Sequence, residues 1–184
     1  RQLRELILAR RSVLLVGEAG VGKTSVIHRT VSDCDAGAIA GASSGPHIFR
    51  TSTSRMISET KYLGEWQSKV TSLVRELESI DGSALYVTDI WNLTSVGRSE
   101  STHETMADLL KEFIESHRIS VIGEATKAQI TSFLDQMPSF RNVFVQLRVD
   151  PVPPDSVRPI LSTAAANLAA RRDVRFEQSA LDRA

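Results

Sequence analysis

The chain has 184 residues, which is enough for one α/β domain with a hydrophobic core and too few for two. Its 22 basic and 22 acidic side chains give a formal net charge of zero, so bulk electrostatics gives no reason to expect a nucleic-acid or anionic-membrane partner. The single cysteine, Cys34, excludes an internal disulfide and favours a reducing compartment, which we take to be the cytoplasm. No apolar run approaches the roughly 20 residues that a membrane-spanning helix requires.

The first residues predict a helix that leads directly into a buried strand. The chain starts with arginine, and RQLRELILARR, residues 1–11, already has helical spacing, so we expect a piece cut from a longer protein. SVLLVG, residues 12–17, is a short apolar run that ends in glycine, which is typical of a buried parallel strand. After a Gly-rich turn, the spacing of Val26, Ile27 and Val31 predicts a helix.

Strands and helices are predicted to alternate along the rest of the chain. Strands are expected near residues 47–51, 83–89, 119–123 and 143–147. Amphipathic spacing predicts helices near residues 66–77, 106–114 and 157–168. This alternation is typical of an α/β three-layer fold, in which helices flank a central parallel sheet.

Two local signals set the expected starts of the later helices. Ser101 and Glu104 have the spacing of a capping box, which places a helix start shortly before Met106. The Pro-rich stretch at 150–154 breaks the chain before the last helix. Pro159 should then lie in the first turn of that helix, where a missing N–H does little harm.

One segment carries a strong chemical signal. GEAGVGKT matches the phosphate-binding pattern GxxxxGK[ST] in full and lies between an apolar strand and a helix. Glycines let the backbone wrap a phosphate, and successive N–H groups point positive dipole at the anion. Lys23 can reach the β- and γ-phosphates, and the Thr24 hydroxyl can bind Mg²⁺. The predicted nucleotide contacts are Gly17, Glu18, Ala19, Gly20, Val21, Gly22, Lys23 and Thr24.

The second element of such a site is an acidic residue at the end of a neighbouring buried strand. LYVTD ends at Asp89, and we expect this carboxylate to hold the Mg²⁺ shell through water. The alternative role for Asp89 is to cap a helix or a turn.

Five stretches, by their order and spacing, resemble the first AAA+ module of the Clp-type protein unfoldases and disaggregases. VLLVGEAGVGKT is similar to the Walker A segment of that family, and LYVTDIWNL is similar to its Walker B strand. KYLGEW, residues 61–66, resembles the family's KYRGEF stretch, whose aromatic residue lines the pore of a hexameric ring. ISVIGEAT resembles the sensor-1 strand, and NVFVQL the strand after the arginine-finger region.

The resemblance spans nearly the whole chain and implies a large α/β AAA+ subdomain over residues 1–172. Residues 173–184 would begin a helical lid whose remainder is missing. The implied cofactors are ATP or ADP with Mg²⁺, the metal being assisted by Thr24 and Asp89. The implied partners are protein substrates or partner AAA+ subunits in a ring oligomer, of which the isolated piece could be a monomer.

The resemblance also implies a substrate pore loop. Its residues would be Lys61, Tyr62, Leu63 and Gly64. The alternative for Tyr62 is a surface aromatic residue beside a helix start.

The departures from the family pattern concern hydrolysis. The family places a glutamate, the general base, directly after the Walker B aspartate, and here that position is Ile90. Its arginine pair aligns with Pro138 and Ser139. A base contributes about 10²- to 10⁴-fold and an arginine finger about 10³- to 10⁵-fold in rate. We therefore expect an ATPase-like domain with weak or absent hydrolysis, in which nucleotide serves assembly or regulation.

Two alternatives remain. The first is a working protein-threading motor with relocated groups, Glu124 as base and Arg141 as finger, although Glu124 could also be a surface or capping residue. At the sensor-1 position, only Thr126 could hydrogen-bond a γ-phosphate or water, so Glu124 and Thr126 are the candidate catalytic residues. The second alternative is a scaffold whose P-loop is vestigial.

Overall fold

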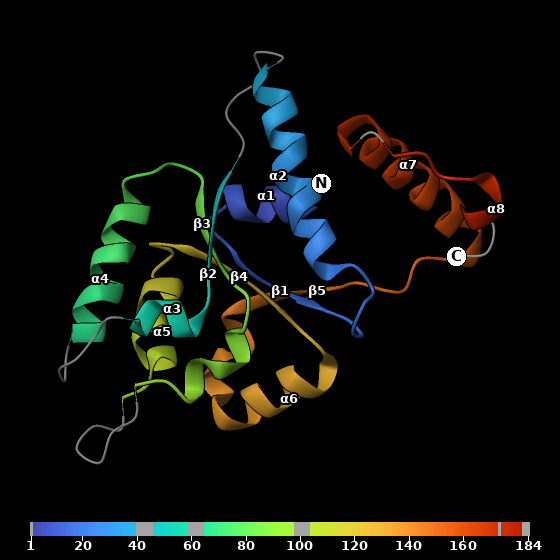
Figure 1. Cartoon of the computed structure of the whole chain (residues 1–184). Coiled ribbons are helices and arrows are strands. Elements are labelled where there is room, and N and C mark those ends of the chain that lie inside the picture. Colours follow the sequence, from blue (N-terminus) through green and yellow to red (C-terminus); the bar gives the residue numbers. More distant parts are fainter. Residues whose placement is uncertain (1, 40–45, 59–64, 98–103, 173, 182–184) are drawn as a thin grey trace. The chain divides into compact units, whose positions relative to one another are not determined.

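The computed structural model describes residues 2–39, 46–58, 65–97, 104–172 and 174–181 (Figure 1). The chain divides into two compact units, Arg1–Val149 and Asp150–Ala184. Within the described residues, none of the helices combines the length and the apolar character that crossing a bilayer requires.

The first unit is built on a sheet of five parallel strands, and this confirms the predicted α/β three-layer class (Figure 1). The order across the sheet is β2-β3-β4-β1-β5, so β1 lies between β4 and β5. The strands are β1 (Ser12–Val16), β2 (His47–Thr51), β3 (Ser83–Val87), β4 (Ser120–Ala125) and β5 (Phe144–Arg148). All five strands agree with the sequence prediction, with ends within two residues of those expected.

Two sets of helices cover the two faces of this sheet. The first face carries α1 (Gln2–Leu8) and α2 (Lys23–Ile39). The second face carries α3 (Thr53–Ile57), α4 (Glu65–Glu78), α5 (Met106–Glu115), α6 (Lys127–Gln136) and the 3₁₀ turns η1 (Ile90–Thr94) and η2 (Pro138–Asn142).

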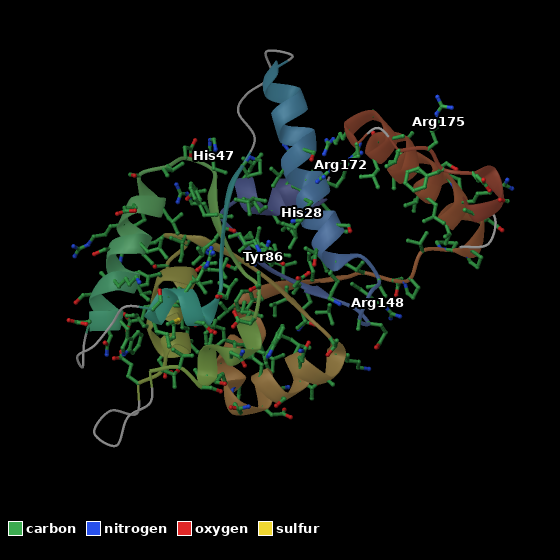
Figure 2. All side chains as sticks on the ribbon, in the orientation of Figure 1. His28, His47, Tyr86, Arg148, Arg172 and Arg175 are labelled. Atoms are coloured by element: carbon green, nitrogen blue, oxygen red, sulfur yellow. The ribbon has the colours of Figure 1, made fainter. Side chains whose placement is uncertain are left out.

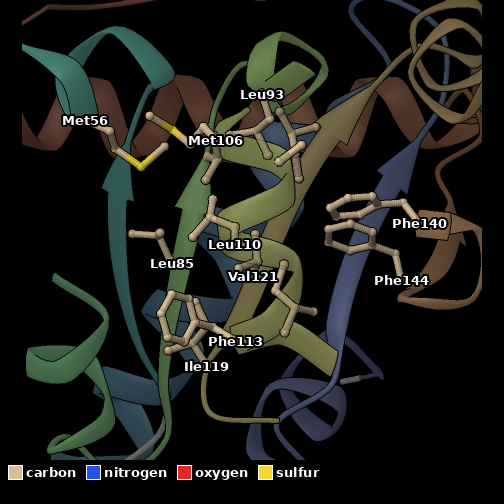
Figure 3. Close-up of a cluster of buried hydrophobic side chains, with 14 of the residues drawn as sticks. Met56, Leu85, Leu93, Met106, Leu110, Phe113, Ile119, Val121, Phe140 and Phe144 are labelled. Atoms are coloured by element: carbon tan, nitrogen blue, oxygen red, sulfur yellow. The ribbon is translucent and has the colours of Figure 1, made fainter. Parts of the chain in front are cut away.

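Side chains alternate between the two faces because successive residues of a strand point to opposite sides. In β3, Tyr86 packs with the α1 and α2 side, whereas Leu85 and Val87 pack with the helices of the other side. Figure 3 shows the larger core, where Leu85 of β3 and Val121 of β4 lie against the side chains of the overlying helices. The side of the sheet to which a strand side chain points therefore decides which helices it contacts.

The helix after β4 was not predicted. α6 buries only Ile130 and Phe133, so its apolar periodicity is weak. Its start is nevertheless marked, because Thr126 and Gln129 form a capping box in which each side chain satisfies the other's backbone N–H.

The predicted cap of α5 is wrong. This helix begins at Met106, and the residue that caps it is Thr105, whose partner in the capping box is Asp108. Glu104 therefore precedes the cap, and Ser101 lies outside the described residues. The reason is chemical, since Thr105 and Asp108 have the same spacing as the predicted pair, and Thr105 lies directly before Met106, the first buried residue of the helix.

The second unit contains α7 (Pro154–Arg172) and the short α8 (Gln178–Leu181). The predicted place of Pro159 is wrong, because α7 already begins at Pro154 and Pro159 is its sixth residue. Pro154 takes the favourable first position, while Pro159 lies in the second turn and leaves the carbonyl of Asp155 without its helical donor. The boundary at residue 172 and the lid over 173–184 stay predictions.

Candidate nucleotide-binding site

The P-loop connects the end of β1 to the start of α2, as the sequence predicted. Gly20 and Gly22 have φ values of 81° and 95°, in the left-handed region that glycine adopts without strain. At Gly17 the reason for glycine is space, since a Cβ atom there would lie 2.3 Å from the carbonyl oxygen of Val149. The loop thus needs its glycines for conformation at two positions and for close packing at a third.

The start of α2 provides the positive end of the site. α2 begins at Lys23, so the N–H groups of its first turn point out of the helix, where an anion can accept them. The Lys23 ammonium donates to the carbonyl oxygens of Gly17 at 2.9 Å and of Glu18 at 2.7 Å. These bonds hold the charge at the loop, and both Lys23 and Thr24 line the same cavity.

A cavity of about 380 Å³ opens at the P-loop. Its described lining residues are Ala19, Gly20, Gly22, Lys23, Thr24, Ser25, Trp91, Glu124, Ala125, Thr126 and Gln129. Among these, Lys23 and Glu124 are the charged members. A larger and more open hollow of about 720 Å³ lies along α6 and includes Glu18. We assign the phosphate site to the smaller cavity because it contains Lys23, Thr24 and the glycine backbone.

Glu124 is hydrogen-bonded directly to Thr24, the threonine of the P-loop. The Thr24 hydroxyl lies 2.9 and 2.8 Å from the two carboxylate oxygens of Glu124, and the Tyr86 hydroxyl donates to the first of these oxygens at 2.6 Å. Figure 2 labels Tyr86 in the middle of the first unit. Three neighbouring segments, β3, β4 and α2, therefore meet at one carboxylate.

The strand register explains why these residues meet. Tyr86 pairs with Ile122, and Glu124 follows Ile122 by two residues, so Tyr86 and Glu124 share the face that α2 covers. β4 is also the direct neighbour of β1, and the N–H of Gly17 donates to the carbonyl oxygen of Ala125 at 3.2 Å. The carboxyl end of β4 thus lies against the start of the P-loop.

Tyr86 stays a neutral hydrogen-bond donor in this arrangement. The pKa of its phenol is raised above the ordinary value of 10.0, first because burial disfavours the phenolate and then because its hydroxyl bonds to Glu124. A neutral hydroxyl keeps its proton for the Glu124 carboxylate, whereas a phenolate would repel it.

Asp89 lies on the other side of the sheet. Its carboxylate accepts hydrogen bonds from the backbone N–H of Thr53 at 2.8 Å and the Thr53 hydroxyl at 2.5 Å, and from the Asn92 amide at 3.4 Å. Asp89 is not among the described residues that line the P-loop cavity. The structure thus places the Asp89 carboxylate beside Thr53, the first residue of α3. The assistance of Asp89 to Mg²⁺ stays a prediction.

Position 90 does not face the cavity. The Ile90 side chain is fully buried in the core and packs on Gly123, where a Cβ atom would lie 2.5 Å from the Ile90 Cδ1 atom. The following residue, Trp91, lines the cavity instead. The family resemblance suggested that a general base is lost at residue 90. Because Ile90 does not face the cavity, its identity does not show whether the site has a base.

The remaining predicted residues differ in their distance from the site. Thr126 lines the cavity and caps α6. Arg141 lies in η2, exposed, and its guanidinium is 3.4 Å from the Asp135 carboxylate. Pro138 and Ser139 open the same turn. The predicted pore loop, residues 61–64, lies outside the described residues.

Several residues of the site were missed from the sequence, and Tyr86, Gln129 and Trp91 show why. Tyr86 could have been found, because strand alternation puts it on the same face as Glu124. Gln129 could have been found from its capping-box spacing with Thr126. Nothing in the sequence pattern points to Trp91, since the direction of its side chain depends on the 3₁₀ turn η1.

The donor set fits Mg²⁺ in the presence of a nucleotide. Among the described residues there is no group of three or more His, Cys, Asp or Glu side chains that could hold a metal ion unaided. Mg²⁺ at nucleotide sites uses one or two protein ligands and takes its other oxygens from phosphates and water. The Thr24 hydroxyl and a carboxylate beside it match this requirement.

Residues 13–145 match the family model described as "ATPase family associated with various cellular activities (AAA)". The chaperone protein ClpB of Propionibacterium freudenreichii is 24% identical over 179 residues, which cover 95% of this chain and 21% of that protein. The chain thus spans about a fifth of the length of this relative.

Two solved structures of S. cerevisiae Hsp104 have the same fold. The Hsp104–ADP complex superposes with a TM-score of 0.71 at 23% identity, covering 96% of this chain and 25% of that chain. The extended Hsp104–casein complex gives a TM-score of 0.76 at 22% identity, covering 97% of this chain and 31% of that chain.

Proposed function

This chain belongs to the AAA family of ATPases, and from that premise we propose that it is the nucleotide-binding module of a Clp-type chaperone ATPase. The module binds ATP or ADP together with Mg²⁺ and hydrolyses ATP weakly or not at all. Nucleotide serves to tighten assembly or to regulate a partner, and chemical turnover is secondary.

Nucleotide binding is supported by the P-loop itself. The glycine conformations, the first turn of α2 and the Lys23 ammonium all converge on the cavity that also holds Thr24. Phosphate recognition needs this combination of backbone N–H groups and a cation. The choice of adenine follows from the family and from the Hsp104–ADP complex that shares the fold.

One observation carries the proposal of weak hydrolysis. Glu124 is the single carboxylate among the described cavity-lining residues, and its oxygens already accept hydrogen bonds from Thr24 and Tyr86. A general base must direct one of its lone pairs at the attacking water. Glu124 instead points at the P-loop threonine.

The setting of the module is proposed from its relatives. We place it in a ring oligomer in the cytoplasm, acting on protein substrates or on partner AAA+ subunits, as its resemblance to the Clp-type proteins implies. Hsp104, which shares the fold, has been solved in complex with casein. Residues 61–64 would form the substrate pore loop, and residues 173–184 would begin the helical lid that follows a large subdomain over 1–172.

The second candidate is an active motor that uses Glu124 as base and an Arg141 finger. It is favoured by the position of Glu124 beside Thr126 in the cavity, and by the exposure of Arg141, from where it could reach a neighbouring subunit. In that case Glu124→Gln abolishes turnover and leaves nucleotide affinity intact.

The experiment is a side-by-side measurement of ATP binding and steady-state phosphate release on the full-length protein and its Lys23→Ala variant. We expect binding by the native protein, at least about tenfold weaker binding by Lys23→Ala because a phosphate contact is lost, and phosphate release near background in both. Lys127→Ala, an exposed lysine on α6, is the matched control and should bind like the native protein.

Two results contradict this proposal. Turnover at the rate of ordinary AAA+ motors that disappears in Lys23→Ala favours the active motor. If neither protein binds ATP, and Lys23→Ala leaves stability and assembly unchanged, the P-loop is vestigial and the module is a scaffold.

A further inference from the structure

We propose that Glu124 of β4, held in place by Tyr86, supplies the carboxylate of the magnesium site in place of Asp89. The inference rests on the nucleotide binding proposed above and assigns the metal to particular side chains of this chain. It replaces the expectation that the acidic member comes from the end of β3.

The sheet geometry favours Glu124. Side chains on the α2 face of β3 are those of Ala84 and Tyr86, and continuing this alternation places Thr88, an uncharged residue, next on that face. Asp89 follows it and points to the α3 side, where it bonds to Thr53. On the neighbouring strand, Glu124 occupies the α2 face and is bonded to Thr24. The carboxylate beside the P-loop threonine therefore comes from β4 and not from the end of β3.

The bond between Thr24 and Glu124 prepares a cation site. A hydroxyl that donates its proton to a carboxylate leaves the lone pairs of its own oxygen for another partner. A divalent cation placed there would meet the Thr24 oxygen and the Glu124 charge together, with phosphate oxygens completing its shell. Lys23 lies on the P-loop side of the same cavity, where it suits the phosphates.

The Asp89 carboxylate is already held by hydrogen bonds at the start of α3. Its two oxygens accept three hydrogen bonds, two of them from Thr53 at the first position of α3. Turning this side chain towards the P-loop would leave the partly buried Thr53 N–H without a partner, which is unfavourable.

Tyr86 acts as a positioning residue. Its ring is buried among the residues of the α1 and α2 face, and its hydroxyl fixes one oxygen of Glu124. Partners that orient a metal-binding side chain contribute to metal affinity although they do not touch the metal. Tyr86→Phe keeps the ring in its packing and removes only this hydrogen bond.

The test measures metal binding directly. Mn²⁺, a paramagnetic substitute for Mg²⁺, is titrated into the full-length protein with saturating ADP, and free Mn²⁺ is followed by electron paramagnetic resonance. ADP affinity in EDTA is measured separately by calorimetry. The variants are Glu124→Gln, Asp89→Asn, Tyr86→Phe and, as a control carboxylate exposed on α4, Glu76→Gln.

We expect Glu124→Gln to weaken Mn²⁺ binding by about 10- to 100-fold and Tyr86→Phe to weaken it less. ADP affinity in EDTA should be unchanged or higher in Glu124→Gln, because a negative charge near the phosphates is removed. Asp89→Asn and Glu76→Gln should bind Mn²⁺ like the native protein.

Native-like Mn²⁺ binding by Glu124→Gln overturns the proposal, and so does a loss of about tenfold or more in Asp89→Asn. If Glu124→Gln does not fold, Tyr86→Phe decides, and native-like Mn²⁺ binding in that variant overturns the proposal. Failure of the proposed function looks different, since the native protein would then bind no ADP, with or without Mn²⁺.

Discussion

At the scale of single residues, the most informative contact is the one between Tyr86 and Glu124. A buried phenol beside a carboxylate favours the protonated phenol, so the pKa of Tyr86 is higher in the folded chain than in the unfolded one. This makes the contact visible in the dependence of stability on pH, independently of any nucleotide.

The sign follows from linkage. Below the unfolded pKa of about 10, both states carry the proton and the contribution of Tyr86 is fully present. As the pH rises above this value, the unfolded phenol loses its proton while the folded one keeps it, so the free energy of unfolding falls. Urea unfolding from about pH 8 to pH 11 should show this fall in the native chain and a shallower one in Tyr86→Phe. Identical slopes in both proteins would contradict the raised pKa.

The same residues show what sequence reasoning could and could not find at this scale. The P-loop was found because its chemistry is contained in eight consecutive positions, 17–24. The acidic partner was assigned to Asp89 because it ends an apolar strand. Moving by one residue along a strand reverses the face to which a side chain points. The exact strand register therefore decides which of Thr88, Asp89 and Glu124 faces the P-loop, and the sequence alone does not give that register.

At the scale of elements, α6 connects the site to the fold. Its cap, Thr126, lines the cavity, and its buried residues Ile130 and Phe133 join the larger core. Phe133 meets Phe140 of η2 edge to face at 5.3 Å, and Phe140 stacks on Phe144 of β5 at 5.8 Å. Figure 3 shows Phe140 and Phe144 side by side next to the sheet.

Thr126→Ala should lower the free energy of unfolding by about 1 kcal/mol, because α6 loses its capping hydroxyl. The measurement is urea unfolding of the chain. Thr131→Ala, which removes the same hydroxyl from an exposed position of the same helix, is the control and should change stability little. Equal effects in the two variants would show that the capping bond contributes nothing.

Elements with a strong apolar period were predictable, and elements held by caps or by tertiary contacts were not. β1, β3 and α5 follow from their buried residues alone. α3 has five residues, and the bonds from Asp89 to Thr53 hold its start, so its local pattern is too short to detect. Pro159 was misplaced because Pro154, five residues earlier, is equally suited to begin a helix.

At the scale of the whole first unit, the strand order determines where a ligand can bind. β1 lies between β4 and β5, so the loops after β1 and β4 meet at the carboxyl edge of the sheet, which is where parallel α/β sheets bind ligands. The alternation of predicted strands and helices was enough to predict a parallel sheet. It did not predict the order of the strands, which depends on pairings between residues far apart in the sequence.

Nucleotide should therefore stabilise the protein as a whole. At a ligand concentration of about 100 times Kd, binding to the folded state alone adds about 2.7 kcal/mol, so MgADP should raise the Tm of the full-length protein. Lys23→Ala should lose most of this rise, and Lys127→Ala should keep it. A rise that is the same in all three proteins would place the nucleotide elsewhere.

A tryptophan in the wall of the cavity should make the fluorescence of the protein sensitive to bound nucleotide. The chain contains two tryptophans, and their surroundings differ, since Trp91 lines the cavity while Trp66 packs into the core with 9% of its surface exposed. A bound nucleotide would alter the environment of one indole and leave the other as it was. The unlabelled protein should therefore signal its own occupancy through its ultraviolet emission, and the signal should vanish in Trp91→Phe but persist in Trp66→Phe.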